Sequence, residues 1–334
     1  MTELVLRALR RALFVPMVFV VAAISLALFP LLALLALGIG LVRGDRFAAF
    51  RMLLALQFDA LLEATALVLS GLVWLRWFGR WKGPGFREDS YAVGAWWAGT
   101  IIDALGRIYE LRFEGEGLDE VLPGPILLLP RHVSIADTLM PVALFTRRHG
   151  LNARYVVKRQ LELDPVLDIM GHRVPTAFVK RHGQDPEGDL ARVRSLAEDL
   201  HPDDMIVIYP EGTRFTPGKR ARLERKAEEL HDEAFAARVE RYHHTLPPHH
   251  AGTLALLDRA PGLDVVFLAH TGFDGILHLQ DLASGILIGR VIRMKAWRVS
   301  WEELPSGTEE RAAWLDEQWA RVDDWVAEHP AQRR

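Results

Sequence analysis

An uncharged run of 31 residues, Ala12 to Val42, constrains the fold of this chain more than any other feature. As a helix it would be about 46 Å long at ~1.5 Å per residue, whereas roughly 20 residues cross the hydrocarbon core of a bilayer. The apolar part of a secretory signal is shorter and ends at a small-residue cleavage site. We therefore predict that this run is a retained membrane segment.

A second apolar stretch, Met52 to Leu75, carries Asp59 and Glu63 four residues apart on one helix face. Acids at mid-bilayer are costly unless they face protein or water, so this helix either spans the membrane or lies half-buried against the first one. We predict a membrane-anchoring helical hairpin over residues 1–82 and an α/β domain over residues 90–330.

Basic residues flank both apolar stretches. Three arginines precede the first stretch and four basic residues follow the second, against three arginines between them. The excess predicts that both ends of the hairpin, and hence the remainder of the chain, lie on the cytoplasmic side of the membrane. The absence of cysteine agrees with a reducing compartment, and the net charge of -3 gives no reason to expect nucleic acid as a partner.

From residue 90 onward, short apolar runs alternate with amphipathic segments. Buried strands are predicted at residues 125–130, 153–158, 176–181, 205–210 and 263–270. One amphipathic helix is predicted from Ile135 to about Arg147, and one long charged helix from Arg220 to Tyr242. Buried strands that alternate with helices predict an α/β fold, in which helices cover both faces of a sheet.

The stretch RHVSIAD, residues 131–137, follows the first of these strands. Ser134 is a good N-cap residue with Asp137 three positions later, so Asp137 could simply cap the next helix. If a turn separates His132 from Asp137, the carboxylate can instead orient the imidazole as a general base. Both interpretations stay open from this stretch alone. Without a cysteine, a thiol nucleophile is excluded, which favours a substrate hydroxyl.

A second strand-to-turn transition is YPEGTRFTPGKR, residues 209–220. Gly212 permits a ligand to approach the backbone, and Arg214 offers a planar fork suited to phosphate. Glu211 can orient Arg214 or accept a hydrogen bond from a ligand hydroxyl, although a polar turn closed by a Glu–Arg pair is also common. Further cations stand at the ends of two other predicted strands: Lys158, Lys180 and Arg181. Together they predict a site for an anionic acceptor.

His-x4-Asp, AFVKR and PEGTR, in this order, resemble the motifs of the glycerolipid acyltransferases typified by 1-acylglycerol-3-phosphate acyltransferase. The resemblance covers roughly residues 127–271. It implies that His132 is the general base and Asp137 its partner, and that no metal or cofactor is needed. It also implies an acyl thioester donor, either acyl-CoA or acyl carrier protein. The residues that it assigns to the acceptor's glycerol phosphate are Arg181, Glu211, Gly212, Thr213 and Arg214.

The activity implied is acyl transfer to the free hydroxyl of a lysophospholipid, with 1-acylglycerol-3-phosphate giving phosphatidate as the first candidate. Three positions depart from the usual motifs and leave the acceptor open: Arg131 replaces an asparagine, Pro175 a glycine and Phe267 a proline. Another lyso-lipid is therefore the alternative acceptor. Alternatives of other classes are a membrane-anchored metal-dependent phosphohydrolase and a non-catalytic lipid-binding module. The histidines of HHTLPPHH, residues 243–250, allow a zinc site, although polar loop histidines need no metal.

Overall fold

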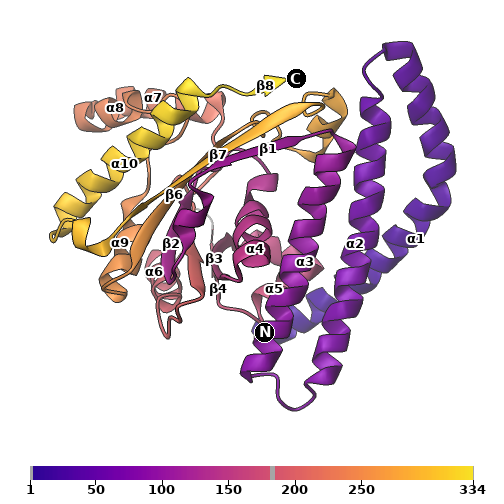
Figure 1. Cartoon of the computed structure of the whole chain (residues 1–334), viewed down its shortest axis with the longest axis horizontal. Helices are drawn as coiled ribbons and strands as arrows, with labels where there is room; N and C mark the ends of the chain where they lie inside the picture. Colours follow the sequence, from indigo (N-terminus) through magenta and orange to yellow (C-terminus); the bar gives the residue numbers. More distant parts are fainter. Residues whose placement is uncertain (1–2, 181–184, 334) are drawn as a thin grey trace.

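The computed structural model describes residues 3–180 and 185–333. Its first two helices, α1 (Glu3–Arg43) and α2 (Ala48–Arg76), lie side by side as a hairpin (Figure 1). Both are long and apolar enough to cross a membrane, and α1 leaves most of its large apolar side chains exposed. The predicted helical hairpin is confirmed.

Helix α2 also packs against α3 (Pro84–Ile108) and against the rest of the chain. The Trp97 indole of α3 donates a 3.0 Å hydrogen bond to Glu63, so this acid faces protein. Ala48 and Ala55 belong to the same buried cluster as Leu128 of the sheet. The hairpin and the sheet thus share a core, and the division into units at residues 82–90 stays a prediction.

One mixed sheet forms the centre of the molecule, with strand order β1-β7-β6-β2-β5-β3-β4 and β8 paired to β7. Strands β6, β2, β5, β3 and β4 run parallel, while β7 is antiparallel to β6 and parallel to β1. The bounds are β1 Arg112–Glu116, β2 Ile126–Pro130, β3 Asn152–Lys158, β4 Thr176–Val179, β5 Asp204–Val207, β6 Asp264–Thr271, β7 Arg290–Val299 and β8 Gln332–Arg333.

Helices cover both faces of this sheet, as predicted (Figure 1). Side chains of β2 alternate between two cores: Ile126 and Leu128 pack in one, and Leu127 and Leu129 in the other. This alternation follows from the two-residue period of a strand. The remaining helices are α4 Arg147–His149, α5 Pro165–Gly171, α6 Pro186–Ser195, α7 Pro217–Leu230, α8 Glu233–Glu240, α9 His250–Arg259 and α10 Thr308–Glu328. Short helical turns are η1 Leu118–Val121, η2 Ala136–Thr138, η3 Val142–Thr146, η4 Arg159–Leu163, η5 Leu279–Ser284 and η6 Trp301–Glu303.

Two helices predicted as continuous are broken. The segment from Ile135 to Arg147 forms η2, the π-helical turn η3 and α4, because Pro141 between the first two lacks an N–H donor and crowds the preceding turn. The long charged helix ends at His231, which adopts a left-handed conformation with φ 51°. The side chain of Asp232 then caps a new helix, α8, by accepting from the Phe235 N–H.

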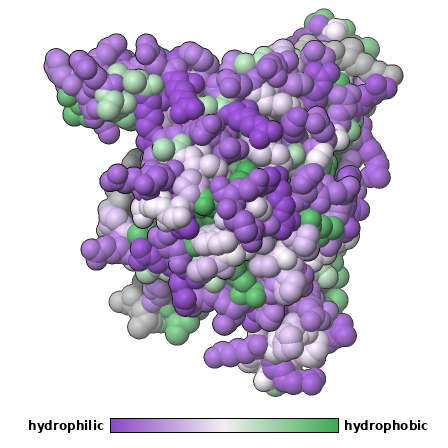
Figure 2. All heavy atoms as spheres, turned by 60° about the vertical axis from the view of Figure 1, so that its left-hand side comes forward, coloured by the Kyte–Doolittle hydropathy of each residue, from purple (hydrophilic) through white to green (hydrophobic). Residues whose placement is uncertain are grey.

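The two sides of the molecule expose different side chains. Figure 2 views the side toward α7, α8 and α10, and that surface is mainly hydrophilic. Most of the exposed large apolar side chains lie instead on α1 and α2. The apolar surface that a membrane would cover is therefore the hairpin.

The carboxyl ends of the parallel strands bring distant motifs to one edge of the sheet. His132 follows β2, and the turn from Tyr209 to Arg214 follows β5. Lys158 ends β3, the strand next to β5. Ligand sites of open α/β sheets are found at this edge.

Candidate active site

His132 lies in the turn after β2, with 13% of its side chain exposed. Its backbone is held on both sides, because its N–H donates to Glu211 Oε1 (2.8 Å) and its carbonyl accepts from the Phe215 N–H (2.7 Å). The imidazole packs against the ring of Tyr209, with centroids 4.6 Å apart. The ring is therefore displayed at the surface of the site on a fixed backbone.

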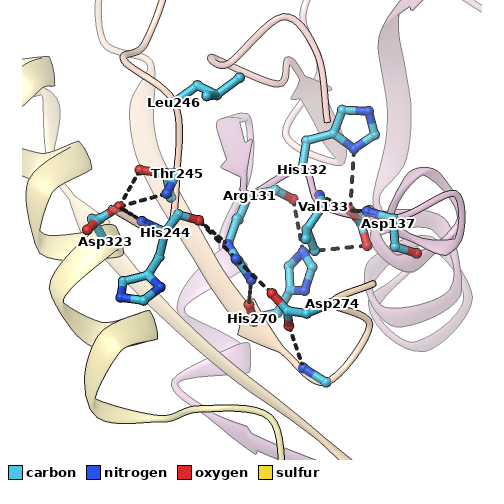
Figure 3. Close-up of polar contacts among 12 residues, drawn as sticks. Arg131, His132, Val133, Asp137, His244, Thr245, Leu246, His270, Asp274 and Asp323 are labelled. Atoms are coloured by element: carbon cyan, nitrogen blue, oxygen red, sulfur yellow. Dashed lines mark hydrogen bonds and ion pairs between the residues drawn. The ribbon is translucent and has the colours of Figure 1, made fainter. Parts of the chain in front are cut away.

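Asp137 contacts both the backbone of the turn and the imidazole of His132 (Figure 3). Its Oδ2 accepts from the N–H groups of Val133 (2.5 Å) and Ser134 (2.6 Å), which closes the turn. The same oxygen lies 3.3 Å from His132 Nδ1. A proton on Nδ1 points toward the carboxylate, and this leaves Nε2 on the far side of the ring as the basic nitrogen.

The electrostatics of this pair favour a neutral histidine beside a carboxylate. Burial lowers the pKa of His132, and the charges of Lys158 and Arg214 add to this effect, whereas Asp137 opposes it. Burial alone would raise the pKa of Asp137, but the His270 and His132 rings and the Ser134 N–H outweigh it and hold that pKa below its usual range. At neutral pH the imidazole can therefore accept a proton.

Glu211 is buried below the turn and does not face a ligand. Its Oε2 accepts from the Leu246 N–H (2.9 Å) while its Oε1 holds His132, so the carboxylate bridges two backbone segments. Burial raises the pKa of Glu211 to about 8, against the lowering effect of both N–H groups and of Arg131. Among the described ion pairs, none joins Glu211 to Arg214. Glu211 therefore supports the backbone of His132, in place of the interaction with Arg214 that the sequence suggested.

Of the remaining residues of the PEGTR turn, Arg214 lines a cavity. Gly212 has φ 62°, and a Cβ there would lie 2.9 Å from His249 Cδ2, so a side chain fits poorly. Thr213 Oγ1 accepts from Lys219 Nζ (2.7 Å). Arg214 donates from Nη1 to the Leu277 carbonyl (2.5 Å) and lines the cavity beside His132. The guanidinium is thus anchored by one nitrogen to the Leu277 carbonyl at the cavity that His132 also lines.

The other predicted cations are distributed unevenly. Lys158 lines the same cavity as His132 and Arg214. Lys180 lies 3.8 Å from Asp185 and lines a different cavity together with Arg10 and Arg159. Arg181 lies outside the described residues. The structure therefore brings Lys158, but not Lys180, to the candidate site.

An apolar cavity of about 350 Å³ extends from His132 into the protein. Its walls come from α3, η3, β3, α5 and β4, which are far apart in the sequence. Residues that represent these walls are Ala98, Val142, Val157, Met170 and Phe178. The lining is that of a site for an apolar ligand, and the cavity reaches the imidazole of His132.

A buried polar network behind His132 was not predicted. The Arg131 guanidinium, 1% exposed, donates to the carbonyls of His270 (2.8 Å) and His244 (2.9 Å) and to Asp274 (2.8 Å). Asp323 of α10 accepts from the backbone N–H groups of residues 243–245 (Figure 3). The only sign of this network in the sequence was Arg131, which stands where an asparagine is usual. Its hydrogen-bond partners lie on β6 and on two loops.

The predicted histidine-rich loop uses its side chains in protein contacts. His250 Nε2 lies 3.1 Å from Asp316 and 2.7 Å from Arg238. Within the residues that the structure describes, the one group of three possible metal ligands is Glu162, Asp168 and His172, which lies elsewhere. Among the described residues, the histidines of this loop form no such group.

Comparison with known proteins agrees with this architecture. An acyltransferase family model matches residues 112–242. No curated protein matches the chain. A similar solved structure is the crystal structure of the 1-acyl-sn-glycerophosphate (LPA) acyltransferase PlsC from Thermotoga maritima, with 14% identity and a TM-score of 0.50, over 82% of this chain and 98% of that chain. At this identity the likeness is one of fold. The resemblance carried by the motifs and the predicted α/β fold are confirmed.

Proposed function

We propose that this chain, which matches an acyltransferase family model over residues 112–242, transfers an acyl group from a thioester to the free hydroxyl of a lysophospholipid. The first candidate acceptor is 1-acylglycerol-3-phosphate, which gives phosphatidate. The donor is acyl-CoA or acyl carrier protein. The observation that carries the proposal is the His132–Asp137 pair at the opening of an apolar cavity, with Arg214 beside it.

In the proposed reaction His132 acts as general base and then as general acid. Nε2 takes the proton of the acceptor hydroxyl while its oxygen attacks the thioester carbonyl carbon. The C–S bond breaks, and the leaving thiolate takes the proton back from His132. Asp137 holds the Nδ1 proton and stabilises the imidazolium that exists between these two steps.

The cavity is the proposed binding site for the acyl chain of the donor. Its lining is mainly apolar, and each methylene buried from water contributes about 0.8 kcal/mol. Arg214 and Lys158 at the opening are the proposed partners of the acceptor phosphate, because a guanidinium binds phosphate in a bidentate manner. Thr213 and Gly212 complete the turn around this anion, while Glu211 supports it from below.

The exposed apolar hairpin is proposed to hold the enzyme on the membrane, with the catalytic part on the cytoplasmic side. Acceptor and product are both membrane lipids, so anchoring keeps the site close to its substrate and to the place where the product must leave. The flanking arginines and Lys82 support this orientation.

The test uses the purified full-length protein, isotope-labelled acyl-CoA or acyl carrier protein, and a panel of lyso-lipids, with products identified by mass spectrometry. We expect one acyl group to be added to a phosphate-bearing lyso-lipid. His132→Ala should abolish transfer while the protein still folds, whereas His201→Ala, at an exposed histidine, should not. Transfer at a near wild-type rate by His132→Ala would refute the mechanism. Loss of activity with EDTA and recovery with a divalent ion would favour a phosphohydrolase.

A further inference from the structure

A cluster of charged side chains joins the start of α1 to the short helix α5, far along the chain. Arg10 Nη2 and Arg11 Nε each lie 2.5 Å from one of the two carboxylate oxygens of Asp168. Arg11 also donates to the Asp168 backbone carbonyl (3.2 Å). The Asp168 side chain is 1% exposed. Figure 1 shows the indigo first turns of α1 beside α5.

Two more side chains extend this cluster. His172 lies 3.3 Å from Asp168 and 3.4 Å from Glu162, and Arg10 Nη1 lies 3.3 Å from Glu162. Burial would raise the pKa of Asp168, but His172, Arg11 and Arg10 outweigh it and hold that pKa well below its usual range. The two guanidinium groups belong to α1 and the buried carboxylate belongs to α5. Their ion pairs therefore fasten α1 to α5.

The same short helix forms part of the wall of the apolar cavity. Leu167, Met170 and Gly171 of α5 line it, and Phe178 faces them from β4. The contact is close, because a Cβ on Gly171 would come 2.5 Å from Phe178 Cζ. A helix of seven residues is not stable by itself, so its position depends on what holds it. A small shift of α5 would change the width of the cavity.

We propose that Arg10 and Arg11 are positioning residues for the acyl donor: by holding Asp168 they fix the α5 wall of the cavity and so set which acyl chain lengths it accepts. This inference rests on the proposed function, since it takes the cavity as the acyl-chain site. The first turns of α1 then have a role in substrate choice in addition to membrane anchoring.

The experiment measures kcat/KM of the full-length protein for a series of acyl-CoA donors that differ only in chain length. In the variant Arg10→Gln/Arg11→Gln, the preference for the best long donor over a short one should fall more than tenfold, because each well-packed methylene is worth about fourfold. The control is Arg7→Gln, on the same helix, for which the described residues show no ion pair. Its preference should stay at the wild-type value.

Two further measurements separate selectivity from anchoring and folding. Vesicle flotation reports membrane binding. The chain-length preference of Arg10→Gln/Arg11→Gln should change even where its flotation is unchanged. If Arg10→Gln/Arg11→Gln fails to fold, Asp168→Asn serves as the second variant. It removes the buried carboxylate itself, so no unpaired buried charge remains on α5. It should lower the chain-length preference in the same direction. Arg10→Lys/Arg11→Lys keeps both charges and should restore part of the preference.

An unchanged chain-length preference in folded Arg10→Gln/Arg11→Gln or Asp168→Asn overturns the inference. An equal change in Arg7→Gln overturns it too, because the effect would then come from the charge of α1 alone. Failure of the proposed function gives a different result: the wild-type protein would transfer no acyl group from any donor in the series.

Discussion

Replacement of Asp137 by asparagine tests the catalytic pair with little disturbance of the fold. The side-chain oxygen of asparagine can take the place of Oδ2, which accepts from the Val133 and Ser134 N–H groups and faces His132 Nδ1. The turn and the ring orientation should therefore survive in Asp137→Asn. The change removes the negative charge 3.3 Å from the imidazole.

The distance between the two groups sets an upper limit on the size of the effect, and the retained hydrogen-bond acceptor keeps the loss below that limit. A unit negative charge 3.3 Å from an imidazolium contributes about 5 kcal/mol at an effective dielectric constant of ~20. General base catalysis as a whole is worth about 10²–10⁴-fold, and the hydrogen-bond acceptor is retained. We therefore expect kcat/KM of Asp137→Asn to fall by about 10²-fold, less than for His132→Ala.

The pH profile gives a second readout with a definite sign. The neutral form of His132 is the proposed base, so activity should be lost as pH falls through its pKa. Burial already lowers that pKa, and Asp137 is the group that raises it. Removing the carboxylate lowers the pKa further, so the acid limb of kcat/KM moves to lower pH while the plateau falls.

The assay is initial-rate acyl transfer over a pH series, with circular dichroism of each variant as the folding control. A plateau within threefold of the wild type would refute the catalytic role of the pair. An acid limb that moves to higher pH would refute the electrostatic account of His132, even if the rate falls.

Two further expectations concern the anion site and the buried network. Arg214→Lys keeps the charge but loses the planar fork, so the apparent KM for the lyso-lipid should rise by roughly tenfold while the donor KM stays unchanged; initial rates with each substrate varied in turn check this. Asp323→Ala leaves the N–H groups of residues 243–245 without their acceptor and should lower the free energy of unfolding by about 3 kcal/mol, as measured by denaturant titration.

Local patterns in the sequence predicted the strands and the pair at the turn. The uninterrupted apolar run at residues 126–129 can only be buried on both faces, and a turn after it is required by Pro130 and Ser134. The break in the following helix was not predicted, although Pro141 lies inside the predicted span and is a local signal for it. These features depend on neighbours in sequence, and local physical chemistry decides them.

Contacts between distant segments could not be read in this way. Glu211 looks like a ligand in the sequence, yet its oxygens bind the backbone of His132 and Leu246, 79 and 35 residues away. Arg131 reaches Asp274 over 143 residues. The cavity has the same origin, because no single element forms its wall. Such features depend on which helices the sheet brings together.

The hairpin packs against residues that line the proposed active-site cavity. Leu62 and Leu67 of α2 share a buried cluster with Trp97 of α3 and Met170 of α5, and these last two residues line the cavity. A chain that begins near Ser90 would therefore lose part of α3 and uncover the back of the cavity wall. Its inactivity would not tell membrane anchoring from loss of the site. Point substitutions at Arg10 and Arg11 remove none of these core side chains, so they can separate the two roles where a truncation cannot.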